Sequence, residues 1–325
     1  MSNNQKWKDK LLSSSFPLEY EAMKLIASEG FSVSSEYTYS RLDGDVKKDF
    51  SVDIDALDFT PFGNPNEITS DVHFLIECKY RKSGTYWLFL PDPNEDEYSP
   101  FTLGQTIRAV DNFTKFKLGP NCVISFDDND ELPFCIKGVE IDIVNSSAHD
   151  AQIKHGLSQL QYALPAMFEN LINSSSYAAP DEAIPFFICP ILLTNAPLFV
   201  ANNDFSMNAV KDSNCIEDIA HEVPYLVTYH DISPDFTEHC RKEFESKLKF
   251  DLKHLEEVGN YRSARGSYEL ELPINLIESL IQGRTSELKG HFTQFIVCNW
   301  ENFPQLIQDL KDSITLAMSS VESDT

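Results

Sequence analysis

The hydrophobic positions along this chain follow two periods, and segments of the two kinds alternate. Apolar side chains recur at every second position, or form short unbroken runs, in segments that are typical of strands. These predicted strands are residues 31–39, 50–57, 74–81, 86–90, 122–126, 139–144, two runs within 185–200, 224–229 and 292–298. Helical spacing marks residues 18–29, 150–171, 236–258 and 303–317. Strands that alternate with helices predict an α/β layer fold.

The connecting segments suggest how the chain is divided. A charged turn is expected at 41–49, and a long hairpin loop rich in Pro, Gly and Asn at 61–71. Residues 1–15 are expected to be a flexible polar tail before a single domain of residues 16–325. Within that domain, residues 206–290 are either an insertion or an accessory lobe, although the predicted strand at 292–298 suggests a return to one sheet.

Composition indicates a globular protein with a strong negative charge. Hydrophobic residues make up 42% and charged residues 24%, which argues against wholesale disorder. No apolar run reaches the ~20 residues that a membrane helix needs. Seven scattered cysteines without a Cys-x-x-Cys pair predict reduced thiols in a cytoplasmic protein. The net charge of −25 should repel a polyanion, so a nucleic acid would have to meet a local basic patch, which is expected near the front of the chain.

Four charged side chains in the first part of the chain are predicted to lie close together. Glu77 and Lys79 share one face of their strand, because side chains alternate between faces. Asp53 lies on the neighbouring predicted strand, and Glu19 lies on the apolar stripe of helix 18–29 and is expected to point inward. Taken without the other residues, Glu77 and Lys79 could simply form an ion pair. Glu19 by itself could be explained by the helix dipole, which favours a glutamate in the first turn. Together with Asp53, they favour a functional site.

These residues, in this order, resemble the PD-(D/E)XK nuclease superfamily. The matching motifs are Leu18-Glu19 on a helix closed by Gly30-Phe31, then Asp53-Ile-Asp-Ala56, then Glu77-Cys-Lys79. They cover residues 16–90, and the remainder agrees only in general layout. The resemblance implies a restriction-endonuclease-like mixed central sheet flanked by helices, and an enzyme that hydrolyses phosphodiester bonds in DNA. The biological settings that it implies are restriction, repair and phage defence.

The resemblance also implies a Mg²⁺ or Mn²⁺ cofactor and a role for each residue. Asp53, Glu77 and the backbone carbonyl of Cys78 would hold the ion, since hard divalent cations prefer oxygen ligands. Lys79 would position the attacking water or stabilise developing negative charge. Glu19 would support a second ion or bridge to it through water.

Other residues leave alternatives open. Asp55 shares a face with Asp53, so either could be the ligand, and Asp53 is favoured by its place in the motif. Val52 stands where the proline that gives the superfamily its name would be. Gln159 and Tyr162 resemble a glutamine-tyrosine motif of exonuclease branches, with a spacing one residue short. They either support the site or are solvent-exposed polar residues.

The expected partner is DNA, which a second protein would help to deliver to so acidic a chain; no membrane partner is expected. Several cations near the motif strands either contact phosphates or form a solvated hairpin face: Arg41, Lys47, Lys48, Arg81 and Lys82. The alternative to an enzyme is a non-catalytic module that keeps the nuclease fold and binds a protein or nucleic acid. The eight histidines lack zinc-site spacing, and no nucleotide-binding motif is present.

Overall fold

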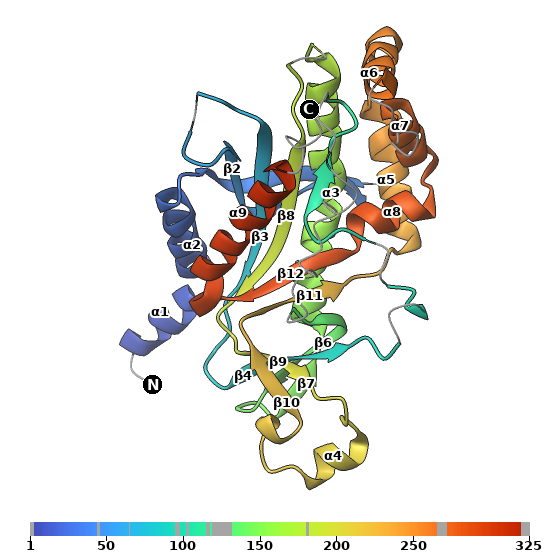
Figure 1. The fold of residues 1–325 in the computed structure, drawn as a ribbon. Helices are drawn as coiled ribbons and strands as arrows, with labels where there is room; N and C mark the ends of the chain where they lie inside the picture. Colours follow the sequence, from blue (N-terminus) through green and yellow to red (C-terminus); the bar gives the residue numbers. More distant parts are fainter. Residues whose placement is uncertain are drawn as a thin grey trace.

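The computed structural model describes residues 3–43, 46–64, 66–94, 98–101, 104–114, 118, 132–179, 182–264 and 272–319. The strands in these ranges form one mixed sheet of twelve strands (Figure 1). The order is β1-β2-β3-β8-β12-β11-β6-β4-β9-β10, with β5 paired to β8 and β7 to β6. The bounds are β1 (Ser32–Asp43), β2 (Val46–Thr60), β3 (Ser70–Lys79), β4 (Thr85–Pro91), β5 (Arg108–Val110), β6 (Phe134–Asp142), β7 (Ser147–His149), β8 (Phe186–Thr194), β9 (Leu198–Ala201), β10 (Ala220–Val223), β11 (Tyr225–Tyr229) and β12 (Gln294–Asn299).

Helices cover both faces of this sheet, as the alternating pattern predicts. Helices α2 (Phe16–Ser28) and α9 (Phe303–Ser319) pack their apolar side chains against β2, β3, β8 and β12 on one face. On the other face lies the long α3 (Ala151–Tyr177), together with α5 (Pro234–Lys247), α7 (Pro273–Gln282) and α8 (Thr285–Phe292). The other helices are α1 (Asn3–Leu12), α4 (Met207–Asp212) and α6 (Leu252–Ala264). The prediction of a mixed α/β sheet flanked by helices is confirmed.

Three neighbouring strands, β3, β8 and β12, run parallel in the middle of the sheet. Their carboxyl ends therefore meet at one edge, which is where ligands bind in open α/β sheets. Side chains tie these ends together, since the Thr194 hydroxyl donates to the Lys79 carbonyl at 2.8 Å. The Asn299 amide likewise donates to the Ala196 carbonyl at 2.8 Å. The end of β3, which carries Lys79, is thus fixed against its neighbours.

The residues of β3 alternate between the two apolar layers. Ile76 and Cys78 are buried beneath α2 and α9, whereas Leu75 belongs to the layer beneath α3. By the same alternation, Glu77 and Lys79 face α3. Two charged side chains therefore lie between the sheet and its longest helix.

Helix α3 approaches this part of the sheet closely because of Gly156. A Cβ atom at this position would lie 2.6 Å from Leu192 Cδ1 and 3.4 Å from Lys79 Cε. A larger residue would force the buried Leu192 side chain or the helix itself to shift. The absence of a side chain at Gly156 therefore brings α3 next to the Lys79 side chain.

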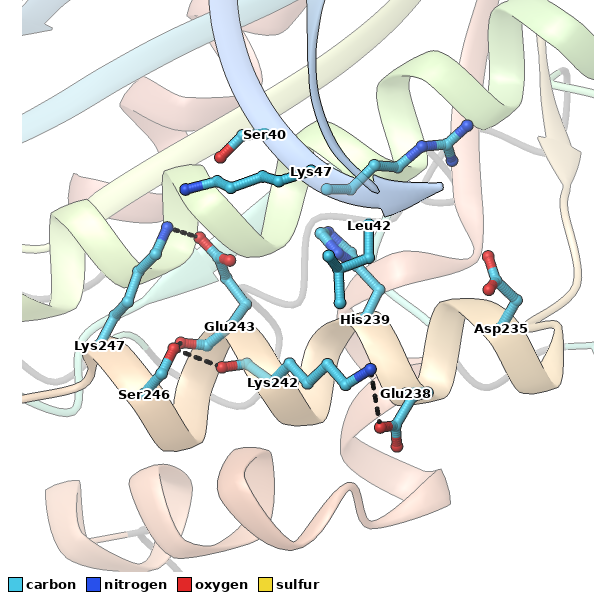
Figure 2. Close-up of a pocket in the computed structure, with 11 residues that line it drawn as sticks. Ser40, Leu42, Lys47, Asp235, Glu238, His239, Lys242, Glu243, Ser246 and Lys247 are labelled. Carbon is cyan, nitrogen blue, oxygen red and sulfur yellow. Dashed lines mark hydrogen bonds and ion pairs between the residues drawn. The ribbon is translucent and has the colours of Figure 1, made fainter. Parts of the chain in front are cut away.

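The β1–β2 hairpin changes sides of the sheet half-way along. Ile54 belongs to the apolar layer of α2 and α9, whereas Val52 belongs to the layer of α3. In a regular strand, these two residues would share a face. The ladder pairs Ser35 with Ile54 and Tyr37 with Val52, so the change occurs between these two pairs. The far half of the hairpin consequently packs against α3 and lies opposite α5 (Figure 2).

Two sequence-based predictions about segments are wrong. The expected turn at 41–49 is instead occupied mainly by strand, since β1 extends to Asp43 and β2 begins at Val46. The expected helix at 236–258 is two helices, α5 and α6. Asn173 of α3 stabilises the break between them, because its side chain donates to the Lys247 carbonyl at 3.2 Å and accepts from the Lys249 amide at 3.0 Å.

Other segments also differ from expectation. Residues 3–12 form α1 where a flexible tail is expected; its apolar side chains are exposed, so no buried stripe marks it in the sequence. Residues 206–290, expected as an insertion or accessory lobe, supply β11 to the middle of the sheet, β10 to one edge, and α5, α7 and most of α8 to one face. The strand expected at 122–126 lies outside the described residues. Within the described ranges, no helix combines the length and apolar character that crossing a membrane requires.

Candidate functional site

Helix α2 brings Glu19 to the end of β3. The helix begins at Phe16, with proline in its first turn, a position where the missing N–H is not needed. The Ser15 hydroxyl accepts a hydrogen bond from the Tyr80 amide at 3.0 Å, which ties the start of the helix to the residue after Lys79. Glu19, in the first turn, is half-buried close enough to Asp53 and Lys79 to interact electrostatically with both.

Asp53 contacts the Glu77–Lys79 segment directly. The β2–β3 ladder ends at the Ile54–Ile76 pair. One residue further on, Asp53 Oδ2 accepts a hydrogen bond from the Cys78 amide at 2.7 Å. Burial raises the pKa of Asp53, and this hydrogen bond partly opposes the shift because it favours the ionised carboxylate.

Asp55 lies elsewhere. It pairs with Leu75 in the ladder, further from the end of β3, and burial raises its pKa. Of the two aspartates that the sequence leaves as candidate ligands, Asp53 is the one whose side chain contacts the Cys78 amide.

Glu77 is a buried carboxylate with one oxygen left open. Its side chain is 1% exposed. Oε1 accepts from the Lys79 ammonium, whereas Oε2 is buried without a hydrogen-bond partner among the described residues. Burial and then the Asp53 carboxylate raise the pKa of Glu77 to about 8, more than the neighbouring Lys79 lowers it. An open anionic oxygen in such a position favours a bound cation or proton.

Lys79 is held between β3 and α3. Its ammonium donates to Glu77 and also to Gln159 Oε1 at 3.0 Å. The Gln159 amide nitrogen in turn donates to the Ser51 carbonyl at 3.3 Å, which orients the side chain. Gln159 therefore supports Lys79, and the interpretation of Gln159 as a solvent-exposed residue is wrong.

Tyr162 and Arg41 form a stack one turn further along α3. The Arg41 guanidinium lies 4.1 Å from the centre of the Tyr162 ring and 4.3 Å from that of Phe50. Tyr162 is 8% exposed and donates to Asp235 at 2.5 Å, so it too is part of the packing. Arg81, a candidate phosphate contact, instead pairs with Glu140 at 2.6 Å.

Glu36 is a fourth carboxylate near the site, and no motif in the sequence marks it as a site residue. Its neighbours Ser35 and Tyr37 pair with Ile54 and Val52 on β2. The register therefore places Glu36 opposite Asp53. Its φ is 71°, a left-handed conformation that is uncommon for a residue other than glycine. Its charge helps to raise the pKa values of Glu19 and Asp53. The Gly44-Asp45 dipeptide is a hairpin-turn signal, and counting outward from it would have found this pairing.

These groups fit a hard divalent cation. Asp53 and Glu77 offer carboxylate oxygens, and Glu77 Oε2 has no hydrogen-bond partner in the described part of the chain. A positive charge would also relieve the mutual repulsion of the carboxylates. The described residues include no group of three or more His, Cys, Asp or Glu side chains placed to hold a metal ion. An ion here would therefore take two carboxylates, the Cys78 carbonyl and several waters, as Mg²⁺ commonly does.

A separate cleft of about 190 Å³ lies between the β1–β2 hairpin and α5 (Figure 2). Its charges largely neutralise one another, since Lys242 pairs with Glu238 at 3.2 Å and Lys247 with Glu243. It is lined by Ser40, Arg41, Leu42, Lys47, Asp235, Glu238, His239, Lys242, Glu243, Ser246 and Lys247. The candidate metal ligands do not line this cleft, and we assign it no role.

Comparison with known proteins gave no match to a family model, to a curated protein or to a solved structure.

Without a divalent ion, the protonation of Glu77 and Glu19 is expected to make stability fall between about pH 5 and pH 8. Burial and the neighbouring Asp53 raise the pKa of Glu77 from 4.5 to about 8 and that of Glu19 to about 7. The folded protein therefore holds protons that the unfolded chain releases. This contribution to stability is complete below the unfolded pKa values and is lost as the pH rises through the folded ones.

Glu77→Gln, which cannot ionise, should consequently exceed the wild type in stability at pH 8. The expected gain is more than about 1.4 kcal/mol, the value of one pKa unit, and should vanish near pH 5. Urea unfolding in EDTA at both pH values measures it. Glu222→Gln, at an exposed position of β10, is the control and should show no such pH-dependent gain. A Glu77→Gln protein that is less stable than the wild type at both pH values would contradict the expectation.

Glu36→Gly is expected to stabilise the protein by about 0.5–1 kcal/mol, because glycine adopts the left-handed conformation without strain. The matched control is Ser34→Gly, an exposed position on the same strand that lacks positive φ. There, glycine should lower stability by a similar amount. Urea unfolding of the two variants checks the opposite signs, and an equal loss in both would argue against strain at Glu36.

Proposed function

We propose that this protein is a metal-dependent nuclease that hydrolyses phosphodiester bonds in DNA, with a restriction-endonuclease-like arrangement of its sheet. The observation that carries the proposal is the placement of the Lys79 ammonium against buried Glu77, with Asp53 bonded to the intervening Cys78 amide. These groups meet where the central parallel strands end, and Glu19 approaches them from α2.

Each residue has a role in this proposal that follows from its position. Asp53 and Glu77 would hold one Mg²⁺ or Mn²⁺ ion together with the Cys78 carbonyl. The ion would supply Lewis-acid polarisation of the scissile phosphodiester. Lys79, held by Gln159, would offer its ammonium to the negative charge that develops on the phosphate. Glu19 would accept a proton or a hydrogen bond from the attacking water, and the burial that raises its pKa to about 7 supports this role.

The charge of the chain bears on how DNA would reach this site. A net charge of −25 opposes long-range attraction of a polyanion. We therefore propose that binding depends on a local positive surface, with or without a partner protein that delivers the DNA. A solution setting such as the cytoplasm, and roles in restriction, repair or phage defence, remain part of the same proposal.

The test combines cleavage with ion-linked stability. The purified full chain is incubated with linear, supercoiled, branched and single-stranded DNA in Mg²⁺, in Mn²⁺ and in EDTA. We expect cleavage only with a divalent ion. In parallel, the midpoint of thermal unfolding should rise with Mn²⁺, because a ligand that binds only the folded state stabilises it.

Two matched variants identify the ligand. Asp53→Asn keeps an oxygen for the Cys78 amide but removes the charge, so it should lose the Mn²⁺ stabilisation. Asp55→Asn should keep it. A wild-type protein that shows neither cleavage nor stabilisation would refute the proposal. Stabilisation lost equally in both variants would refute the assigned ligands, and DNA binding without cleavage would favour a non-catalytic module.

A further inference from the structure

Three aromatic side chains are exposed on α1 and α2, the helix pair whose corner is tied to the end of β3. Trp7 on α1 is 56% exposed, and Phe16 and Tyr20 on α2 are 64% and 57% exposed. Phe16 and Tyr20 are one helical turn apart, so they stand side by side on the solvent face of α2. Glu19 lies between them in sequence, which places this aromatic pair beside the candidate site.

Lysine side chains accompany these rings. Lys8 Nζ lies 5.9 Å from the centre of the Trp7 ring, and Lys24 Nζ lies 5.1 Å from that of Tyr20. Helix α1 also carries Lys6 and Lys10, and both are exposed. A basic segment of this kind contrasts with a chain whose net charge is −25.

The corner between α1 and α2 is tied to the end of β3. Ser15, at this corner, accepts the hydrogen bond from the Tyr80 amide, and Tyr80 directly follows Lys79. A ligand that lies along α1 and the start of α2 would therefore reach the carboxylates at the sheet edge. The α1–α2 surface is defined by Lys6, Trp7, Lys8, Lys10, Phe16 and Tyr20.

We infer that the α1–α2 surface binds the single-stranded part of a nucleic-acid substrate beside the Asp53–Glu77 site. Proteins bind single-stranded nucleic acids through aromatic rings on which the bases stack and through cations that contact the phosphates. The α1–α2 surface offers both kinds of side chain. Bases in an intact duplex offer no free face for such stacking. This inference rests on the proposed nuclease function, and it assigns the substrate as DNA with an unpaired or frayed segment.

The binding test does not need cleavage. Fluorescein-labelled oligothymidylate of about twenty nucleotides, long enough for a single-strand site, is titrated with the full chain in EDTA and followed by anisotropy. Tyr20→Ala and Trp7→Ala should each weaken binding by about fivefold or more, the effect of losing one stacked base. Tyr177→Ala, at a 70% exposed position on α3, is the matched control and should bind as the wild type does.

The lysines are tested through the salt dependence. Replacing Lys6, Lys8 and Lys10 together by glutamine should reduce the slope of log K against log salt by about 2, as expected for three lost phosphate contacts on a single strand. Size-exclusion chromatography and flotation with anionic phosphatidylserine vesicles accompany each variant.

Three results would overturn the inference. These are no binding of oligothymidylate by the wild type, equal loss in Tyr177→Ala, or variants that change only the oligomeric state or vesicle binding. The last result would assign the surface to a second copy or to a membrane. Failure of the nuclease proposal is distinguishable, because a protein that never cleaves DNA would still lose oligothymidylate binding in the Tyr20→Ala and Trp7→Ala variants.

Discussion

Lys79→Met is expected to slow DNA cleavage about a hundredfold or more, with little change in DNA binding. Methionine preserves the packing of the side-chain stem against α3, where Gly156 leaves room for it. The ammonium is lost, and with it a positive charge aimed at the place where negative charge develops during hydrolysis. Removing one such preorganised group typically reduces the rate by about 10²–10³. Single-turnover cleavage at saturating Mg²⁺ measures the chemical step directly.

The controls separate catalysis from folding. Lys211→Met removes an exposed lysine on α4 and should leave the cleavage rate unchanged. Gln159→Leu keeps Lys79 but removes its support, so it should slow cleavage less than Lys79→Met does, with the same ion dependence. Urea unfolding confirms that each variant is folded. Cleavage by Lys79→Met at the wild-type rate would show that the ammonium serves only as the partner of Glu77.

The core of the candidate site was predictable because its residues follow local rules. Strand alternation alone places Glu77 and Lys79 on one face, and the hairpin that the loop at 61–71 predicts brings Asp53 beside them. In the structure, the Asp53 carboxylate accepts a hydrogen bond from the Cys78 amide, which agrees with this placement.

The remainder of the site depends on contacts between distant segments. The approach of Gln159 to Lys79 requires α3 to lie close to β8, which depends on a glycine 77 residues beyond Lys79 in the chain. Periodicity shows that α3 is amphipathic but does not specify which strand it crosses. For the same reason, the change of face in the β1–β2 hairpin could not be inferred, because Val52 and Ile54 alternate regularly in the sequence.

Arg108 illustrates how a mixed sequence pattern can conceal a central residue. It lies in β5, within a region for which the hydrophobic pattern predicts little, yet its side chain is fully buried. The guanidinium donates to the carbonyls of His291 at 2.8 Å and Thr106 at 2.9 Å, and to that of Gln294. It also lies 5.1 Å from the centre of the Phe295 ring. Arg108 thus joins β5 to the α8–β12 connection, along the edge of β8 that β5 and β12 share.

The Arg108 guanidinium is buried against neutral carbonyls, without a carboxylate partner among the described residues. Burial therefore lowers its pKa to about 9. Because each buried carbonyl that loses its donor is destabilised by about 1–3 kcal/mol, removing the guanidinium should have a large effect. The loss is partly offset, since a buried charge is removed at the same time.

Arg108→Met should lower the free energy of unfolding by about 3 kcal/mol, the lower end of the sum for three orphaned carbonyls. Arg108→Lys keeps the charge but lacks the planar fork that reaches three separate acceptors, so it should recover only part of this stability. The matched control is Arg241→Met on the exposed side of α5, where the change should stay within about 0.5 kcal/mol. Urea unfolding followed by tryptophan fluorescence measures all three variants. Equal stability of Arg108→Met and Arg241→Met would contradict the prediction. It would mean that the three carbonyls find other donors and that the guanidinium does not join β5 to β12.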